Sequence, residues 1–111
     1  MSTYLEQAKT VAGFVETLSR EHPKAAEGFL TLHKASAGDS ALTGRQKELI
    51  ALGISIAIRC EGCISCHVKA ALKAGATQEE IVETIGVSIL MGGGPSVVYG
   101  EKAYQAMKEM M

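Results

Sequence analysis

The chain lacks an excess of charge of either sign. Its 11 basic and 12 acidic side chains give a formal net charge of −1, and the pI is near 6.3. Nucleic-acid-binding domains usually carry a clustered basic surface, and helices that lie on membranes carry a basic amphipathic face. The sequence has neither pattern, so we expect no nucleic-acid partner and no membrane partner.

The chain also lacks a long apolar run. The longest apolar stretch, Leu49 to Ile58, is shorter than the roughly 20 residues that a membrane-spanning helix needs. Residues 1–20 mix polar and apolar side chains and do not resemble a secretory signal. We therefore expect a cytoplasmic location, where a cysteine pair is more often catalytic or metal-binding than structural.

Aromatic residues are scarce, although apolar residues are abundant. Apolar residues make up 47% of the chain and aromatic residues only 5%. A chain of 111 residues is long enough for one domain with its own hydrophobic core. Segment 48–58 is apolar on nearly every side of a helix, which a small bundle covers poorly by itself. We therefore expect a homo-oligomer, and a central core helix within a monomer is the alternative.

The apolar spacing predicts a compact all-α domain of about six helices over residues 1–111, with no convincing strand alternation. Pro23 suits the first turn of a helix, and capping-box patterns at residues 43–46 and 77–80 indicate two further helix starts. Gly62 is expected to permit a bend. The expected helices cover residues 4–20, 23–37, 43–59, 63–74, 77–90 and 95–110.

Most of the chemically reactive side chains lie within Cys60-Glu-Gly-Cys63-Ile-Ser-Cys66-His67. Cys60 and Cys63 form a Cys-x-x-Cys pair, and His67 follows Cys63 by four residues. On a helix this spacing lets the imidazole approach the Cys63 sulfur and favour the nucleophilic thiolate. If Cys63 opens a helix, the free N–H groups of the first turn also favour the thiolate. The stretch predicts thiol chemistry.

Other interpretations of these residues remain open. Cys66 is interpreted as a small buried core residue, with a third redox thiol or a metal ligand as the functional alternative. The three cysteines and His67 match a Cys₃His zinc set, but a regular helix would not wrap such close ligands around one ion. The cysteine pair could also be simple core packing. We expect no metal and no cofactor, and we interpret His22 and His33 as ordinary surface or helix-end residues.

One spacing resembles that of a known family. Glu48, eleven intervening residues, Cys60-x-x-Cys63, three residues and His67 resemble the active-site pattern of the alkylhydroperoxidase D-like, or carboxymuconolactone decarboxylase, family. The resemblance continues in residues 45–52, 70–81 and 92–95 and covers about residues 25–108. It implies an all-helical domain that assembles into trimers or hexamers. Members with the cysteine pair act as thiol-dependent peroxidases or disulfide reductases.

The resemblance also implies roles for the four residues. Carried over by position, Cys63 is the attacking thiolate, Cys60 the resolving thiol, and His67 with Glu48 the proton-relay pair. The substrate would be a peroxide or a partner's disulfide, and an unidentified dithiol or protein reductant would regenerate the pair. On a straight helix Glu48 lies roughly 18 Å from Cys60. Contact with His67 therefore requires crossing helices, a bridging water or a neighbouring subunit.

Position 62 departs from the well-studied peroxidase members, which carry a histidine immediately before the second cysteine. Gly62 lacks that relay group, which argues against efficient alkylhydroperoxide turnover but leaves general thiol–disulfide exchange intact. Two alternative functions belong to other classes. The same family contains cofactor-free decarboxylases of a carboxylated lactone, which do not need a cysteine pair. The chain could also be a non-catalytic redox-sensing or metal-binding module.

Overall fold

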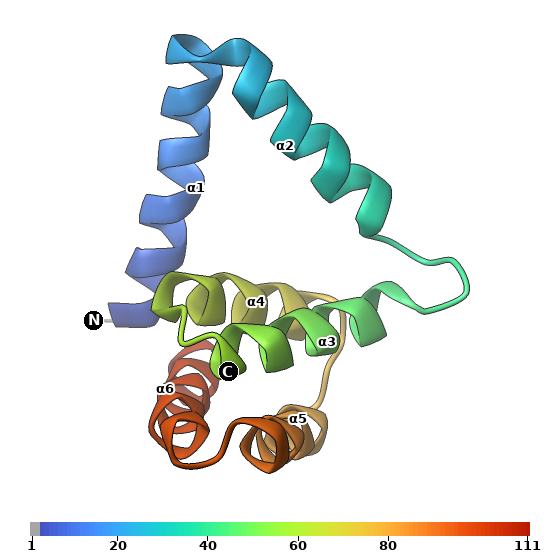
Figure 1. The fold of residues 1–111 in the computed structure, drawn as a ribbon, viewed down its shortest axis with the longest axis vertical. Coiled ribbons are helices and arrows are strands. Elements are labelled where there is room, and N and C mark those ends of the chain that lie inside the picture. Colours follow the sequence, from blue (N-terminus) through green and yellow to red (C-terminus); the bar gives the residue numbers. More distant parts are fainter. Residues whose placement is uncertain (1–2) are drawn as a thin grey trace.

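The structure, a computed structural model, describes residues 3–111 and consists of α-helices joined by short turns (Figure 1). The six helices are α1 (Thr3–Glu21), α2 (Pro23–Ser36), α3 (Gly44–Ala57), α4 (Glu61–Lys73), α5 (Gln78–Gly92) and α6 (Gly94–Met110). The predicted all-α fold is therefore confirmed. Within residues 3–111, no helix combines the length and the apolar character that crossing a bilayer requires.

The helices form two regions, which we call the body (α3 to α6) and the arm (α1 and α2). In the body, α3 packs against the other three helices. The first turns of α1 pack on α4 and α6, and α1 then rises away from them (Figure 1). α2 runs back toward the body and packs mainly on α1, so the arm and the body enclose an open angle.

The hydrophobic core lies in the body. Six of the largest fully buried side chains come from all four of its helices: Leu52 and Ile56, Ile64 and Val68, Ile81, and Met107. Burying a side chain of this size stabilises a fold by about 1.5–3 kcal/mol. The arm buries only Ala8 and Ala26. The core of the body therefore fixes the relative positions of α3 and α4.

The two predicted capping boxes are present. The Thr43 hydroxyl accepts the Gln46 N–H at 3.1 Å, and the Gln46 side chain accepts the Thr43 N–H at 2.9 Å. Thr77 and Glu80 make the same reciprocal pair at 3.1 and 2.9 Å. Each box satisfies two backbone donors that a helix start leaves free, so these starts fall where the sequence predicts them.

The fourth helix begins earlier than predicted. It starts at Glu61 rather than Cys63, with Cys60 as its N-cap residue. The Cys60 sulfur accepts the Cys63 N–H at 3.3 Å and so stabilises this earlier start. Gly62 consequently lies inside the first helical turn and not at a bend. The chain reverses instead at Arg59, whose φ of 60° is left-handed.

Candidate functional site

The reversal between α3 and α4 places the chemically reactive residues side by side. The Arg59 N–H donates to the Ile56 carbonyl at 3.1 Å, and the Cys60 N–H donates to the Ser55 carbonyl at 3.0 Å. These bonds close the end of α3 while Arg59 turns the chain back. Because α3 and α4 then run antiparallel, a residue early in α3 lies beside a residue in the middle of α4.

Glu48 and His67 make direct contact. The Glu48 Oε1 atom lies 2.8 Å from the His67 Nδ1 atom, and their side chains are 19% and 28% exposed. A carboxylate can only accept, so Nδ1 carries the hydrogen and Nε2 remains available for proton exchange. The crossing of α3 and α4 brings the two residues together within one chain, without a bridging water or a neighbouring subunit.

The two cysteines of the Cys-x-x-Cys pair are joined as a disulfide in the structure. The Cα atoms of Cys60 and Cys63 lie 5.2 Å apart, and both residues are half-buried. Both belong to the start of α4, where the helix macrodipole favours a negative sulfur. The capping N–H of Cys63 reaches the Cys60 sulfur, so Cys60 takes the direct hydrogen bond. The expectation that Cys63 opens the helix was therefore wrong.

Cys66 is free and half-buried rather than fully buried. Burial raises the pKa of the Cys66 thiol, while the nearby Lys69 ammonium acts in the opposite direction. Desolvation disfavours a thiolate, which makes Cys66 a poor candidate for attack on a substrate. Within residues 3–111, no three His, Cys, Asp or Glu side chains are grouped so that they could hold a metal ion.

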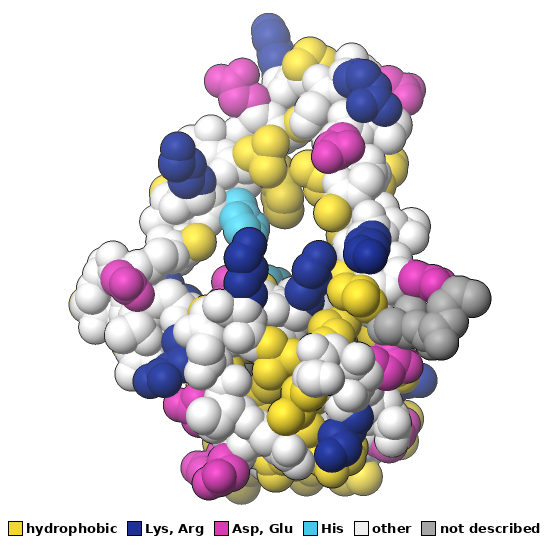
Figure 2. All heavy atoms as spheres, turned by 180° about the vertical axis from the view of Figure 1, so that it is seen from behind, with side chains coloured by type: hydrophobic (Ala, Val, Ile, Leu, Met, Phe, Trp, Pro, Cys, Tyr) yellow, Lys and Arg dark blue, Asp and Glu magenta, His cyan; other side chains and the backbone are white. Residues whose placement is uncertain are grey.

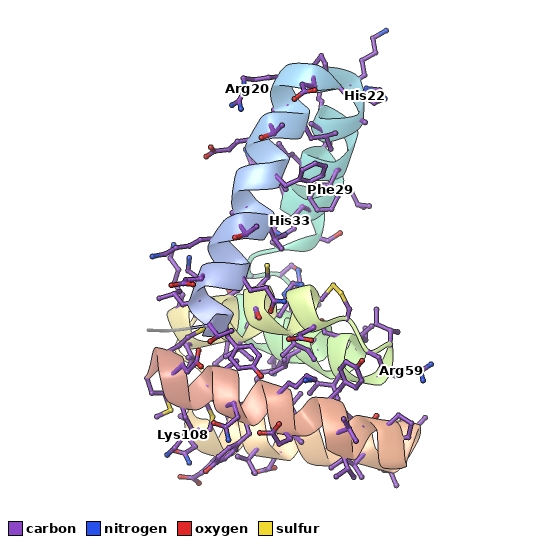
Figure 3. The ribbon with its side chains drawn as sticks, turned by 90° about the vertical axis from the view of Figure 1, so that its left-hand side faces the viewer. Arg20, His22, Phe29, His33, Arg59 and Lys108 are labelled. Carbon is purple, nitrogen blue, oxygen red and sulfur yellow. A yellow bond between two sulfur atoms is a disulfide. The ribbon has the colours of Figure 1, made fainter. Side chains whose placement is uncertain are left out.

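The cysteines, Glu48 and His67 open on a cavity of about 540 Å³ between the arm and the body. Figure 2 shows this space as a hollow with histidine side chains at its edge. The arm supplies a mostly apolar wall made of Val11, Ala12, Val15, Phe29, Leu30 and His33. Figure 3 labels Phe29 and His33 on the part of α2 that runs back toward the body.

Sequence reasoning did not identify the arm's contribution to this cavity. From the sequence, His33 is interpreted as an ordinary surface or helix-end residue, whereas His33 and Phe29 both line the cavity. Their membership in the site depends on where α1 holds the arm. The base of α1 is held on the body: the Ser65 hydroxyl donates to the Gln7 side chain, the Tyr4 N–H donates to a Glu109 carboxylate oxygen at 3.0 Å, and Ala8 is buried. No local spacing signals this arrangement.

The fold and the site together define a class of all-helical protein, in which a cysteine pair lies beside a glutamate–histidine pair. A sequence profile of the carboxymuconolactone decarboxylase family matches residues 23–106. The chain therefore belongs to the carboxymuconolactone decarboxylase family, and the predicted family resemblance is confirmed.

Curated relatives and solved structures agree with this assignment. An uncharacterized protein in the cox locus of Paracoccus denitrificans is 36% identical, with 96% of this chain and 95% of that protein covered. The crystal structure of an apo family member from Legionella pneumophila superposes with a TM-score of 0.94 at 35% identity, covering 99% and 98% of the two chains. A family member from Thermotoga maritima, for which a role in an antioxidative response has been suggested, gives 0.84 at 26% identity, covering 95% and 89%.

Proposed function

We propose that this chain is a thiol–disulfide oxidoreductase that reduces a peroxide or a partner's disulfide with its cysteine pair. One observation carries the proposal. The Cys60–Cys63 pair and the contacting Glu48–His67 pair line the same cavity. A dithiol, a base and a carboxylate that orients the base are the parts that activate a thiol and then close a disulfide.

In this proposal Cys63 attacks and Cys60 resolves. His67 lies one helical turn after Cys63 on α4, so its imidazole can take the Cys63 proton while Glu48 stabilises the resulting imidazolium. The thiolate attacks the terminal oxygen of a peroxide and becomes a sulfenic acid, while the other oxygen leaves with the electron pair of the O–O bond and is protonated to an alcohol or water. The Cys60 thiol then attacks that sulfur, releasing water and forming the disulfide.

The suggested antioxidative role of the Thermotoga maritima relative supports a peroxide as substrate. The cycle consumes two electrons, so a dithiol or a protein reductant must return the Cys60–Cys63 disulfide to its thiols. A reducing, cytoplasmic setting fits that requirement. No cofactor takes part, since the sulfur atoms carry both electrons.

We also propose that the chain works as a homo-oligomer, a trimer or a hexamer. Large apolar side chains of the body remain exposed: Ile50 and Ile54 on α3, Ile58 directly after α3, and Val87, Leu90 and Met91 on α5. A groove of about 430 Å³ runs between α3 and α5. Sedimentation velocity should give a mass of three or six chains, and Leu90→Asp should lower that mass. A wild-type monomer at micromolar concentration would contradict the proposal.

The first test is mass spectrometry of the fully reduced protein after one equivalent of peroxide, with alkylation and peptide mapping. We expect a loss of two hydrogens confined to a Cys60–Cys63 disulfide, reversed by a dithiol. Cys66→Ala is the matched control and should give the same product. A cysteine pair that stays fully alkylated after exposure to both peroxide and a small disulfide would contradict the proposal. Turnover of a carboxylated lactone without either cysteine would favour a decarboxylase.

A further inference from the structure

The active-site cavity continues under α2. A second cavity of about 350 Å³ lies beside the first, and the two share four lining residues: Phe29, His33, Glu48 and His67. Glu48 and His67 come from the body, whereas Phe29 and His33 come from the arm. A substrate in this space would therefore have the Glu48–His67 pair on one side and a second imidazole on the other.

His33 is held by its own helix. It lies in the last turn of α2, and its carbonyl accepts the Ala37 N–H at 3.0 Å. The Phe29 ring, four residues earlier on the same face, packs against the imidazole with a centroid separation of 6.1 Å and an interplanar angle of 42° (Figure 3). This contact steadies the imidazole at the cavity wall, and its exposure lets it exchange protons with water.

The oxygen that leaves the peroxide needs a proton, and His67 lies on α4 with the attacking Cys63, not on the wall that faces it. The thiolate attacks one oxygen, and the other oxygen leaves with the electron pair of the O–O bond. Because the breaking bond lies roughly in line with the attacking sulfur, the leaving oxygen points away from α4 and toward the opposite wall. An alkoxide is a poor leaving group unless a positioned acid protonates it.

We propose that His33 is the catalytic residue that protonates the leaving oxygen, an inference that rests on the proposed function. In this step the Cys63 thiolate reacts with an alkyl hydroperoxide, and the His33 imidazolium donates its proton to the leaving oxygen. The products are the Cys63 sulfenic acid, an alcohol and neutral His33. Solvent then reprotonates His33. An imidazole suits this task because it exchanges protons near neutral pH.

The neighbouring groups are less suited to the role. Besides the reacting pair Cys60 and Cys63, the ionisable side chains that share the two cavities with His33 are Lys47, Glu48, Cys66 and His67. Lys47 holds its ammonium 2.9 Å from the Ser40 hydroxyl, and an ammonium is a weak acid at neutral pH. Glu48 is bound to His67. From α1, the lining residues are the apolar Val11, Ala12 and Val15.

Gly62 has no side chain and so supplies no acid. A Cβ atom at Gly62 would lie 3.5 Å from the Val11 side chain, which is already van der Waals contact. A larger side chain there would have to point away from Val11. The structure thus offers an imidazole from α2 in the cavity where position 62 carries no side chain.

The test compares His33→Gln with His22→Gln, a matched histidine at the arm's tip outside both cavities (Figure 3). The reduced Cys60–Cys63 pair is oxidised in a single turnover by each of two peroxides. Its rate of oxidation is measured by quenching samples and alkylating the thiols that remain. tert-Butyl hydroperoxide releases a strongly basic alkoxide, and peracetic acid releases a weakly basic acetate. We expect His33→Gln to slow the first by about 10²-fold and the second by less than about threefold. His22→Gln should match the wild type with both.

The inference also predicts rescue. In His33→Ala, added imidazole should restore oxidation by tert-butyl hydroperoxide without changing oxidation by peracetic acid. If His33→Gln lost the same fraction of its oxidation rate with both peroxides, the inference would be overturned, because His33 would then only shape the cavity. An unchanged rate in His33→Gln would also overturn it. Wild-type thiols that react with disulfides but with neither peroxide would overturn the His33 assignment while leaving the oxidoreductase proposal standing. Thiols inert to all these oxidants would overturn both.

Discussion

The body and the arm differ in whether they have a hydrophobic core of their own. In the body, Leu52, Ile64 and Ile81 have no exposed surface. In the arm, Phe29 and Leu32 are 53% and 67% exposed, although they are as hydrophobic as the core residues. Folding of the body is therefore driven by its own core, whereas the arm buries only two alanines and depends on its contacts with the body.

The two regions also contribute different residues to the site. The densely packed body holds the residues that need fixed distances, namely the cysteine pair and the Glu48–His67 contact. The arm carries the wall that faces them, which includes His33. The distances that the proposed thiol chemistry needs are therefore set by the densely packed body. In the proposed function the substrate would contact the arm, which buries fewer side chains than the body.

The largest expected effect is the loss of turnover when a cysteine of the Cys60–Cys63 pair is replaced. Cys63→Ser removes the proposed nucleophile and should lower peroxide or disulfide turnover by at least about 10³-fold. Cys60→Ser should instead trap a sulfenic acid or a mixed disulfide on Cys63, visible by mass spectrometry of the intact protein. Both variants keep the core and should show wild-type circular dichroism. Undiminished turnover in Cys63→Ser would overturn the assignment of the nucleophile.

The stability comparison can be tested with two leucines. Leu52→Ala opens a cavity in the body and should lower the free energy of unfolding by about 2–5 kcal/mol. Leu32→Ala changes an exposed arm residue and should lower it by no more than about 0.5 kcal/mol. Urea unfolding followed by circular dichroism measures both. A large, concentration-dependent loss in Leu32→Ala would mean that a second copy covers the arm in solution.

A smaller effect is expected from the residue that orients the base. Glu48→Gln keeps the shape of the side chain but removes the charge that stabilises the His67 imidazolium, so turnover should fall by about 10²-fold. The exposed Glu83→Gln on α5 is the matched control and should leave turnover unchanged. Rates of Cys63 oxidation in single turnover provide the measurement. An equal rate in Glu48→Gln and the wild type would remove Glu48 from the mechanism.

The features that could be predicted from the sequence are local. The capping boxes at Thr43 and Thr77 involve residues three positions apart, so their hydrogen bonds need no tertiary structure. The same holds for the cysteine pair and for His67, which lie within eight residues of one another. Short spacings of this kind fix geometry through the helix itself.

The features that could not be predicted depend on tertiary placement. Contact between Glu48 and His67 requires the chain to reverse at Arg59, and arginine carries no signal for a left-handed turn. Spacing alone placed Glu48 too far away, and only the family pattern indicated that it reaches His67. His33 lines the cavity only because the arm is held opposite the cysteine pair, and that placement depends on contacts of α1 with α4.

The smallest expected effect concerns the turn itself. Arg59 is the non-glycine residue with a positive φ among residues 3–111, and it is exposed at the end of α3. A left-handed conformation costs an ordinary residue about 1–2 kcal/mol, and glycine avoids this cost but loses about 0.5–1 kcal/mol of chain entropy. Arg59→Gly should therefore raise the free energy of unfolding by about 0.5–1 kcal/mol.

Calorimetry measures this gain, and Arg59→Ala is the matched control, because alanine removes the charge but keeps the conformational cost. Arg59→Ala should leave the melting temperature nearly unchanged, whereas Arg59→Gly should raise it by about 3–6 °C. Equal shifts in the two variants would trace the effect to charge and not to the backbone. Since the turn belongs to the body, a gain from Arg59→Gly should stabilise the cysteine pair and the Glu48–His67 contact together, without altering the arm.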